Sequence, residues 1–227
     1  MGNFTGADFL NHSRAKKKIQ EVKMAKQAHM AVDFSLFYKI NFPLGGQKMI
    51  LGTDILLKLV KEKKLVEGLC ERDLNNPEGA GFDLRIGELF KISGDAFLGE
   101  TERQTPEAKS VAKYKAGKTT KYVIKPGEFF LGKTIEKVNT PQDITINFKP
   151  RTTTFRSGLH IRTGNVAPTY QGELTFAIKN EGPSNVTLEM GARVIHAQFH
   201  QIKGKSSKYR GQWQGGRVTT GGKEIQV

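Results

Sequence analysis

The chain has 227 residues, a formal net charge of +14 at pH 7 and a pI near 9.8. This length fits one large domain, or one domain with an appendage. The charge favours polyanionic partners such as nucleotides, nucleic acid or an acidic protein surface, although Lys is spread over the whole chain. The single cysteine, Cys70, excludes an internal disulfide, and it excludes a zinc deaminase, which needs several ligands that this chain lacks.

Residues 1–48 are expected to form a basic N-terminal arm. Apolar residues at a rough helical spacing precede an alternating stretch, 33–42 (DFSLFYKINF), that is typical of a strand. Two interpretations stay open: an arm ordered by contact with a partner subunit, or an arm that binds an acidic partner or nucleic acid. No apolar run reaches the roughly 18–20 residues of a membrane span and no signal-peptide core is visible, so we expect a cytoplasmic protein.

The next segments predict one helix followed by short strands. Residues 54–66 (DILLKLVKEKKLV) have the spacing of a helix, with Thr53 or Asp54 as its N-cap. A long loop is expected over 93–120, which is rich in Gly, Thr, Lys and Glu. Strands are expected at 81–90, 122–124, 128–131, 144–148, 173–178 and 186–189. Recurrent short strands with turn residues between them predict a mainly β fold, either a sandwich or a distorted barrel.

Two segments within this region combine Arg with hydroxyl residues, 151–154 (RTTT) and 156–158 (RSG). Arg side chains and hydroxyls placed close together hold phosphate oxygens through charge-assisted hydrogen bonds. The alternative is a solvated basic loop between strands. The tail from Gly204 is Gly-rich and basic, and it either is disordered or closes over an anionic ligand. The predicted division is therefore an arm over 1–48, a β domain over 49–203 and a tail over 204–227.

Several short motifs occur in a fixed order along the chain: 81–87 (GFDLRIG), 126–129 (PGEF) with 134–136 (TIE), 151–159 (RTTTFRSGL), 191–194 (GARV), 209–212 (YRGQ) and 215–220 (GGRVTT). In this order they resemble the signatures of the dCTP deaminase/dUTPase superfamily, in its dCTP deaminase-like branch. Each motif is weak alone, but six in register are specific. The resemblance covers nearly everything from Met49 to about Gly222.

The resemblance implies a dUTPase-like distorted β-barrel and a homotrimer with deoxynucleoside triphosphate sites at the subunit interfaces. It also implies that Mg²⁺ accompanies the triphosphate and that the tail acts as a lid. The positions carried over as substrate or phosphate contacts are Arg151, Thr152, Thr153, Arg156, Tyr170, Arg217 and Thr219. Asp83 and Glu173 are candidates for a metal-water role, with Asp83 the metal ligand; their alternatives are a turn contact and a solvated rim.

The third signature departs from the family pattern at 166–177 (VAPTYQGELTFA). The Asp that dUTPases use to orient sugar and water falls on Ala167, and the Glu that deaminases use to activate water falls on Ala177. Such groups commonly contribute about 10²–10⁴-fold each, and alanine cannot transfer a proton. Two function classes follow: a nucleotide-binding protein of deoxynucleotide metabolism with altered or weak catalysis, or an inactive trimeric relative with a regulatory or assembly role. The catalytic residues remain unknown.

Overall fold

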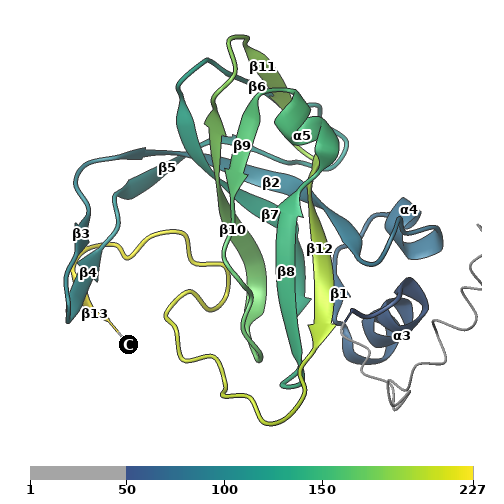
Figure 1. Ribbon diagram of the computed structural model, residues 1–227. Helices are drawn as coiled ribbons and strands as arrows, with labels where there is room; N and C mark the ends of the chain where they lie inside the picture. The colour runs from purple at the N-terminus through teal and green to yellow at the C-terminus, as the bar shows by residue number, and fades with distance from the viewer. Residues whose placement is uncertain (1–49, 227) are drawn as a thin grey trace, which may run out of the picture. The chain divides into compact units, whose positions relative to one another are not determined.

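The computed structural model describes residues 50–226, within one compact unit that runs from Lys48 onward (Figure 1). The predicted arm over 1–48 lies outside these residues, and so do the predictions of its helix, its strand and its partner. Along the described chain, no helix combines the length and the hydropathy needed to cross a membrane.

One antiparallel sheet forms most of the fold, in the strand order β8-β12-β2-β7-β10-β9, with β5 added beside β2 and β1 beside β7. Its strands are β1 Val66–Glu67, β2 Phe82–Ser93, β5 Glu107–Lys113, β7 Phe129–Asn139, β8 Ile144–Pro150, β9 Leu159–Arg162, β10 Gln171–Asn180 and β12 Arg193–Gln201. A bridge between Ile146 and Val166 joins β8 to the segment that follows β9. The two ends of the sheet therefore meet, and the predicted mainly β, barrel-like fold is confirmed.

Strand alternation explains which face of this sheet is buried. In β10 the even-numbered residues from Gly172 to Asn180 point inward, whereas Glu173, Thr175 and Ala177 lie on the other, half-buried face. The same period of two runs along β7 and β12. A sheet that curls into a barrel removes one such face from water, which is why the inward positions are mostly Phe, Leu, Ile and Val.

Two small sheets and three helices complete the described chain. The two-stranded sheet pairs β6 Lys121–Ile124 with β11 Val186–Glu189, and the three-stranded sheet has the order β13 Glu224–Ile225, β4 Glu102–Gln104, β3 Phe97–Leu98. The helices are α3 Thr53–Lys63, α4 Glu71–Asn75 and α5 Thr152–Arg156. A turn at Pro126-Gly127 leads from β6 into β7, and Gly127 adopts a φ of 82° there.

The structure corrects two local predictions. Residues 93–120 hold strands β3, β4 and β5 instead of one long loop, because β5 gains its hydrogen bonds from the distant strand β2. Gly, Thr, Lys and Glu make up half of this stretch, so its sequence carries little of the apolar–polar alternation that signals a strand. The N-cap of helix α3 is Gly52, not Thr53 or Asp54, and no side chain caps the helix. Asp54 lies in the first turn, where its negative charge interacts favourably with the helix dipole.

Candidate functional site

A cavity of about 410 Å³ opens between the main sheet and the C-terminal segment. Its volume lies in the range typical of small-molecule sites. Strands β7, β8 and β10 supply the apolar side chains Leu131, Phe148 and Leu174. The remaining lining residues come from the β9–β10 loop, from the C-terminal segment, and from β10 and the β4–β5 connection: Gly164, Asn165, Val166, Ala167, Tyr170, Tyr209, Trp213, Arg217, Val218, Thr175 and Thr105.

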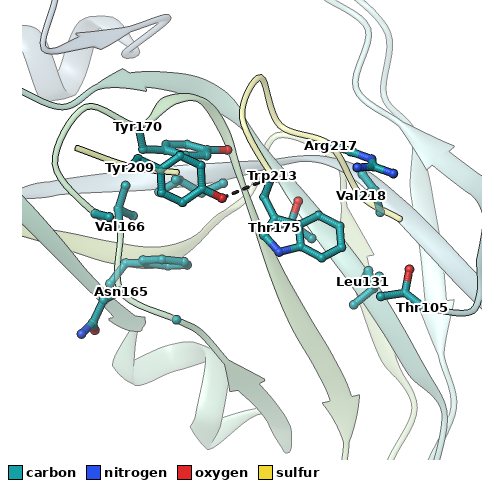
Figure 2. Close-up of a pocket in the computed structure, with 14 residues that line it drawn as sticks. Thr105, Leu131, Asn165, Val166, Tyr170, Thr175, Tyr209, Trp213, Arg217 and Val218 are labelled. Atoms are coloured by element: carbon teal, nitrogen blue, oxygen red, sulfur yellow. Dashed lines mark hydrogen bonds between the residues drawn. The ribbon is translucent and has the colours of Figure 1, made fainter. Parts of the chain in front are cut away.

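Figure 2 shows how these side chains are distributed. Tyr170 and Tyr209 lie together on one side of the cavity, Arg217 lies with Thr105 on the other, and Trp213 lies between them. The two tyrosine rings meet edge to face, with their centroids 5.4 Å apart. The cavity therefore combines aromatic surface at one end with a single guanidinium at the other, an arrangement suited to a ligand with a flat apolar part and an anionic part.

The β9–β10 loop is fixed by backbone contacts to β8 and to the turn before it. Val166 exchanges two hydrogen bonds with Ile146, and Thr140 exchanges two with Thr169 and Tyr170. Tyr170 donates its hydroxyl to the Glu173 carbonyl at 2.6 Å, and burial raises the pKa of this phenol to about 12. The Tyr170 phenol is therefore uncharged at neutral pH, and its hydrogen bond holds the ring in a fixed place in the cavity wall.

Thr169 holds the C-terminal segment against this loop. It has a φ of 66°, a left-handed conformation that is unfavourable for a β-branched residue. In that conformation its hydroxyl accepts a hydrogen bond from the Tyr209 N–H at 2.9 Å, and the Pro168 carbonyl accepts from the same N–H at 3.0 Å. The Tyr209 hydroxyl in turn accepts from the Trp213 N–H at 3.1 Å (Figure 2). The loop thus sets the position of both aromatic residues of the tail.

Gly172 lets the C-terminal segment pass close to β10. Its φ is 138°, and a Cβ placed on it would lie 2.5 Å from the backbone nitrogen of Gly216. Gly215 donates a backbone hydrogen bond to the Gln171 carbonyl at 2.7 Å in the same place. Gly172 must lack a side chain because the tail lies directly against it.

One hydroxyl beside the cavity has no partner. Thr175 Oγ1 is buried, yet no protein atom among the described residues accepts or donates a hydrogen bond to it. A buried hydroxyl left without a partner costs roughly 1–3 kcal/mol. Because Thr175 lines the cavity, a ligand with a polar edge is a suitable partner for this hydroxyl.

The cavity wall lacks the side chains that most often act as a general base. Among the fourteen lining residues, all within the described chain, none has a carboxylate, an imidazole or a thiol. Ala167 is one of these lining residues, whereas Ala177 lies on β10 opposite Leu131 and does not line the cavity. Glu173 borders a separate cavity of about 180 Å³ and lies 3.8 Å from Lys137. It therefore does not supply a carboxylate to the larger cavity.

The predicted phosphate residue Arg151 belongs to a second group, the arginine cluster, which we define as Asp83 with Arg72, Arg151, Arg193 and His196. Asp83 is only 4% exposed, and its Oδ2 lies 2.8 Å from Arg151 Nε and 3.2 Å from Arg193 Nη1. His196 Nδ1 lies 3.0 Å from Oδ1, and Arg72 Nη1 lies 3.7 Å from Oδ2. One buried carboxylate thus draws three guanidinium groups together across β2, β12 and the ends of two helices.

These contacts determine the charge state of Asp83. Burial alone would raise the pKa of its carboxyl, but the His196 hydrogen bond and the charges of Arg151 and Arg193 outweigh burial and lower the pKa. The predicted role of Asp83 as a metal ligand does not fit these surroundings, because three guanidinium groups lie within 4 Å of Oδ2 and the His196 imidazole is bonded to Oδ1. Within the described chain no three His, Cys, Asp or Glu side chains gather as a metal site either.

The other predicted phosphate residues lie on α5. Arg151 precedes this helix, and its N–H donates to the Val194 carbonyl at 3.0 Å, as does the Thr154 hydroxyl. Thr152, Thr153 and Arg156 are exposed on the helix surface. The segment is thus a short helix docked on β12 instead of the irregular basic loop considered from the sequence.

The structure brings only some predicted residues together. Tyr170 and Arg217 line the cavity; Thr219 is half-buried in the same tail segment but does not line it. Arg151, Thr152, Thr153 and Arg156 are not among the lining residues. Sequence reasoning missed Trp213 and Thr175, although a lone Trp in a Gly-rich basic tail was a usable signal.

A family model described as dCTP deaminase-like matches residues 50–202, about two thirds of the chain. The chain belongs to the dCTP deaminase-like family. The resemblance inferred from the six motifs is thereby confirmed. The match ends before the C-terminal segment, which carries Trp213 and Arg217.

Relatives in this family include two kinds of enzyme. The dCTP deaminase of Pyrobaculum calidifontis is 31% identical over 172 residues, which are 76% of this chain and 95% of that protein. The dUMP-forming dCTP deaminase of Dictyoglomus turgidum is 29% identical over 159 residues, 68% of this chain and 81% of the relative. A probable deoxyuridine 5'-triphosphate nucleotidohydrolase of Methanothermobacter thermautotrophicus is 26% identical over 166 residues, 73% of this chain and 99% of the relative.

A solved structure shares the fold. The 2'-deoxycytidine 5'-triphosphate deaminase of Agrobacterium tumefaciens aligns with a TM-score of 0.53 at 15% sequence identity. The alignment covers 67% of this chain and 48% of that one, so this chain spans about half of that protein's length. This likeness concerns the fold of the β domain.

Proposed function

We propose that the protein binds a deoxynucleoside triphosphate with a pyrimidine base, and that its catalysis is altered or weak. The observation that carries this proposal is the cavity itself: aromatic walls, the unpartnered Thr175 hydroxyl and Arg217 fit a base, a polar edge and an anionic group. Family membership supports the choice of ligand, because the relatives named above act on dCTP or deoxyuridine triphosphate.

The proposal of weak catalysis rests on the composition of the cavity wall. Water attack on a base or a phosphate is normally assisted by a group that takes up a proton. The lining residues offer hydroxyls, one amide and one guanidinium, and Ala167 stands where the resemblance places an acid. Positioning and charge stabilisation alone can still support some triphosphate cleavage.

We propose further that the complete site forms between copies of this chain in a homotrimer. Arg151 lies in the arginine cluster and Thr152 and Arg156 on α5, and none of the three lines the cavity of its own chain. A site shared between subunits would allow the arginine cluster of one copy to meet the triphosphate whose base lies in the cavity of another. Mg²⁺ in this proposal is held by the triphosphate oxygens, since Asp83 is already paired with Arg151 and Arg193.

A second candidate function is an inactive trimeric relative that acts in regulation or assembly, and the absence of any acid from the cavity wall favours it. One experiment separates the two. Purified protein is incubated with dCTP, dUTP, dTTP and dATP, and thermal shift and product formation are measured in the same samples. We expect pyrimidine triphosphates to raise Tm, with ammonia release from dCTP absent or very slow. No shift with any nucleotide would overturn nucleotide binding.

The companion variant is Ala177→Glu, which restores a carboxylate on β10 where the resemblance places the water-activating group. If the resemblance is correct, this variant releases ammonia from dCTP faster than the natural protein. Ala108→Glu, on β5 in the described chain, controls for an added carboxylate elsewhere. Rapid ammonia release by the unaltered protein would show that another residue supplies the base.

A further inference from the structure

The last strand of the described chain, β13, carries Glu224, whose carboxylate forms an ion pair with Arg217 in the cavity wall. Glu224 in β13 pairs with Arg103 in β4, and Arg217 reaches the same carboxylate. Glu224 Oε2 lies 2.8 Å from Arg217 Nη2, and Oε1 lies 3.0 Å from Arg103 Nη2. One carboxylate therefore satisfies two guanidinium groups, one of which lines the cavity.

Trp213 completes this arrangement, which we call the Glu224 clasp: Arg103, Trp213, Arg217 and Glu224. The guanidinium carbon of Arg103 lies 4.9 Å from the centroid of the indole ring, and that of Arg217 lies 5.8 Å from it. Gln212 also accepts a hydrogen bond from Arg103 at 2.7 Å. These cation–π contacts hold both guanidinium groups close to the indole, and Arg217, which lines the cavity, can hold an anionic oxygen there.

A pair of threonines ties the clasp to the cavity rim. The Thr105 N–H donates to Thr220 Oγ1 at 3.0 Å, and the Thr220 N–H donates to Thr105 Oγ1 at 2.9 Å. Arg217 also donates to the Thr220 carbonyl. Because Thr105 and Arg217 both line the cavity, a change in the clasp changes the cavity wall.

The charges of the clasp do not balance. Two guanidinium groups face one carboxylate, so the cluster carries an excess of one positive charge beside the cavity. The side chain of Arg217 is still 34% exposed, whereas that of Glu224 is 15% exposed. An anionic ligand can thus approach Arg217, but it must share or take the hydrogen bonds that Glu224 holds.

We propose that Glu224 is a built-in competitor for the anionic part of the ligand: it occupies Arg103 and Arg217 in the free protein and is displaced when the ligand binds. The inference rests on the proposed function for the identity of the ligand, a deoxynucleoside triphosphate. Strand β13 then lowers the affinity for the triphosphate, because the ion pairs of Glu224 with Arg103 and Arg217 must break before the ligand binds.

The decisive variant is Glu224→Gln, which keeps the size of the side chain and removes its charge. The matched control is Glu102→Gln, because Glu102 lies in the same small sheet and forms its ion pair with Lys223 at 3.3 Å, whereas the ion pair of Arg217 is with Glu224. Trp213 is the single Trp of the chain and reports directly on the clasp through its fluorescence. Titration with dCTP and dUTP then gives affinity and clasp movement from one signal.

We expect Glu224→Gln to bind the triphosphate about tenfold more tightly, the size of a typical coupling between two linked binding events. Glu102→Gln should bind as the natural protein does. Equal affinity in all three proteins, or weaker binding by Glu224→Gln, would overturn the inference, since the second result would make Glu224 a support for the arginines. Far-UV circular dichroism and thermal unfolding verify that each variant is folded.

A second readout needs no nucleotide. Iodide is an anion that quenches exposed indole, so its access to Trp213 measures whether Arg103 and Arg217 are free to attract it. Glu224→Gln should increase iodide quenching relative to the natural protein and Glu102→Gln; equal quenching in all three would overturn the clasp. If no nucleotide binds to any protein but iodide quenching rises in Glu224→Gln, the proposed function fails while Glu224 still blocks an anion site.

Discussion

The cavity and the arginine cluster hold charge in opposite ways. The cavity wall is largely apolar and keeps one half-exposed guanidinium, Arg217, whose partner Glu224 is itself near the surface. The arginine cluster surrounds Asp83, which is 4% exposed, with cationic groups that are 25–40% exposed. In the cavity, an external anion can take the place of Glu224 at Arg217. In the arginine cluster, the buried Asp83 carboxylate is itself the anion that the arginines contact.

This contrast teaches that a motif rich in Arg is not by itself a vacant phosphate site. Arg151 uses its Nε for Asp83, so only the remainder of its guanidinium can face a ligand. Asp83 fixes the direction of Arg151 and Arg193, and in this sense it prepares them for an external anion. Stability and binding should therefore respond differently to changes in the two regions.

The largest expected effect follows from Asp83→Asn. The substitution leaves Arg151, Arg193 and His196 without their shared carboxylate, and losing hydrogen bonds to a charged group of this kind costs roughly 1.5–3 kcal/mol when the remaining guanidinium groups are partly exposed. Urea unfolding at pH 7 measures this loss in the free energy of unfolding. Asp95→Asn, at an exposed residue, is the control and should change stability little. A small loss for Asp83→Asn would mean that solvent already screens the cluster.

The same variant has a defined pH dependence. The pKa of Asp83 lies below its ordinary value of 3.8, so the ionised carboxylate contributes stability that is present above that value and is lost as pH falls through the lowered pKa. Burial raises the pKa of Glu136 despite its bonds to Arg85, which gives a contribution of opposite sign, lost as pH rises. The difference between the natural protein and Asp83→Asn should therefore shrink at pH 3 relative to pH 7, and a constant difference would contradict this assignment.

Nucleotide binding should be sensitive to one arginine from each region. Arg217→Ala and Arg151→Ala should each weaken triphosphate binding by one or two decades, because a charge-assisted hydrogen bond contributes roughly 1.5–3 kcal/mol. Calorimetric titration measures the loss. Arg162→Ala, at an exposed position of β9, is the control. An effect of Arg217 without one of Arg151 would confine the site to the cavity of a single chain.

Gly172→Ala tests the close approach of the tail to β10. The added Cβ meets the backbone of Gly216, and the φ of 138° disfavours a side chain, so we expect a loss of about 1–3 kcal/mol in the free energy of unfolding. Gly94→Ala separates the two causes, because Gly94 also has a positive φ, 84°, but has open space around it. Equal losses in both variants would attribute the effect to φ strain alone.

The smallest effect concerns Thr175→Val, which removes the unpartnered hydroxyl while keeping the shape. We expect the free protein to be unchanged or more stable by about 1 kcal/mol, whereas ligand binding should weaken by about tenfold. Thr145→Val is the matched control, since the Thr145 hydroxyl donates to the Val166 carbonyl at 2.8 Å and its loss should destabilise the protein. Unchanged ligand binding by Thr175→Val would show that this hydroxyl stays unused.

The sequence by itself determined the fold class, the family and several pieces of the site. Alternating apolar residues predicted β2, β7 and β10 because a curled sheet buries every second side chain. Tyr170 and Arg217 were found because the segments 166–177 and 215–220 resemble signatures of the family.

Only the tertiary structure decided what those residues contact. Glu224 and Arg103 are 121 positions apart, and Asp83 and His196 are 113 apart, so no local pattern predicts either pair. The strands within 93–120 escaped prediction for the same reason, since β5 is defined by its hydrogen bonds to β2 and not by its own alternation. Local signals follow the period of the backbone, whereas ion pairs and cavities arise where distant segments pack, and folding alone brings those segments together.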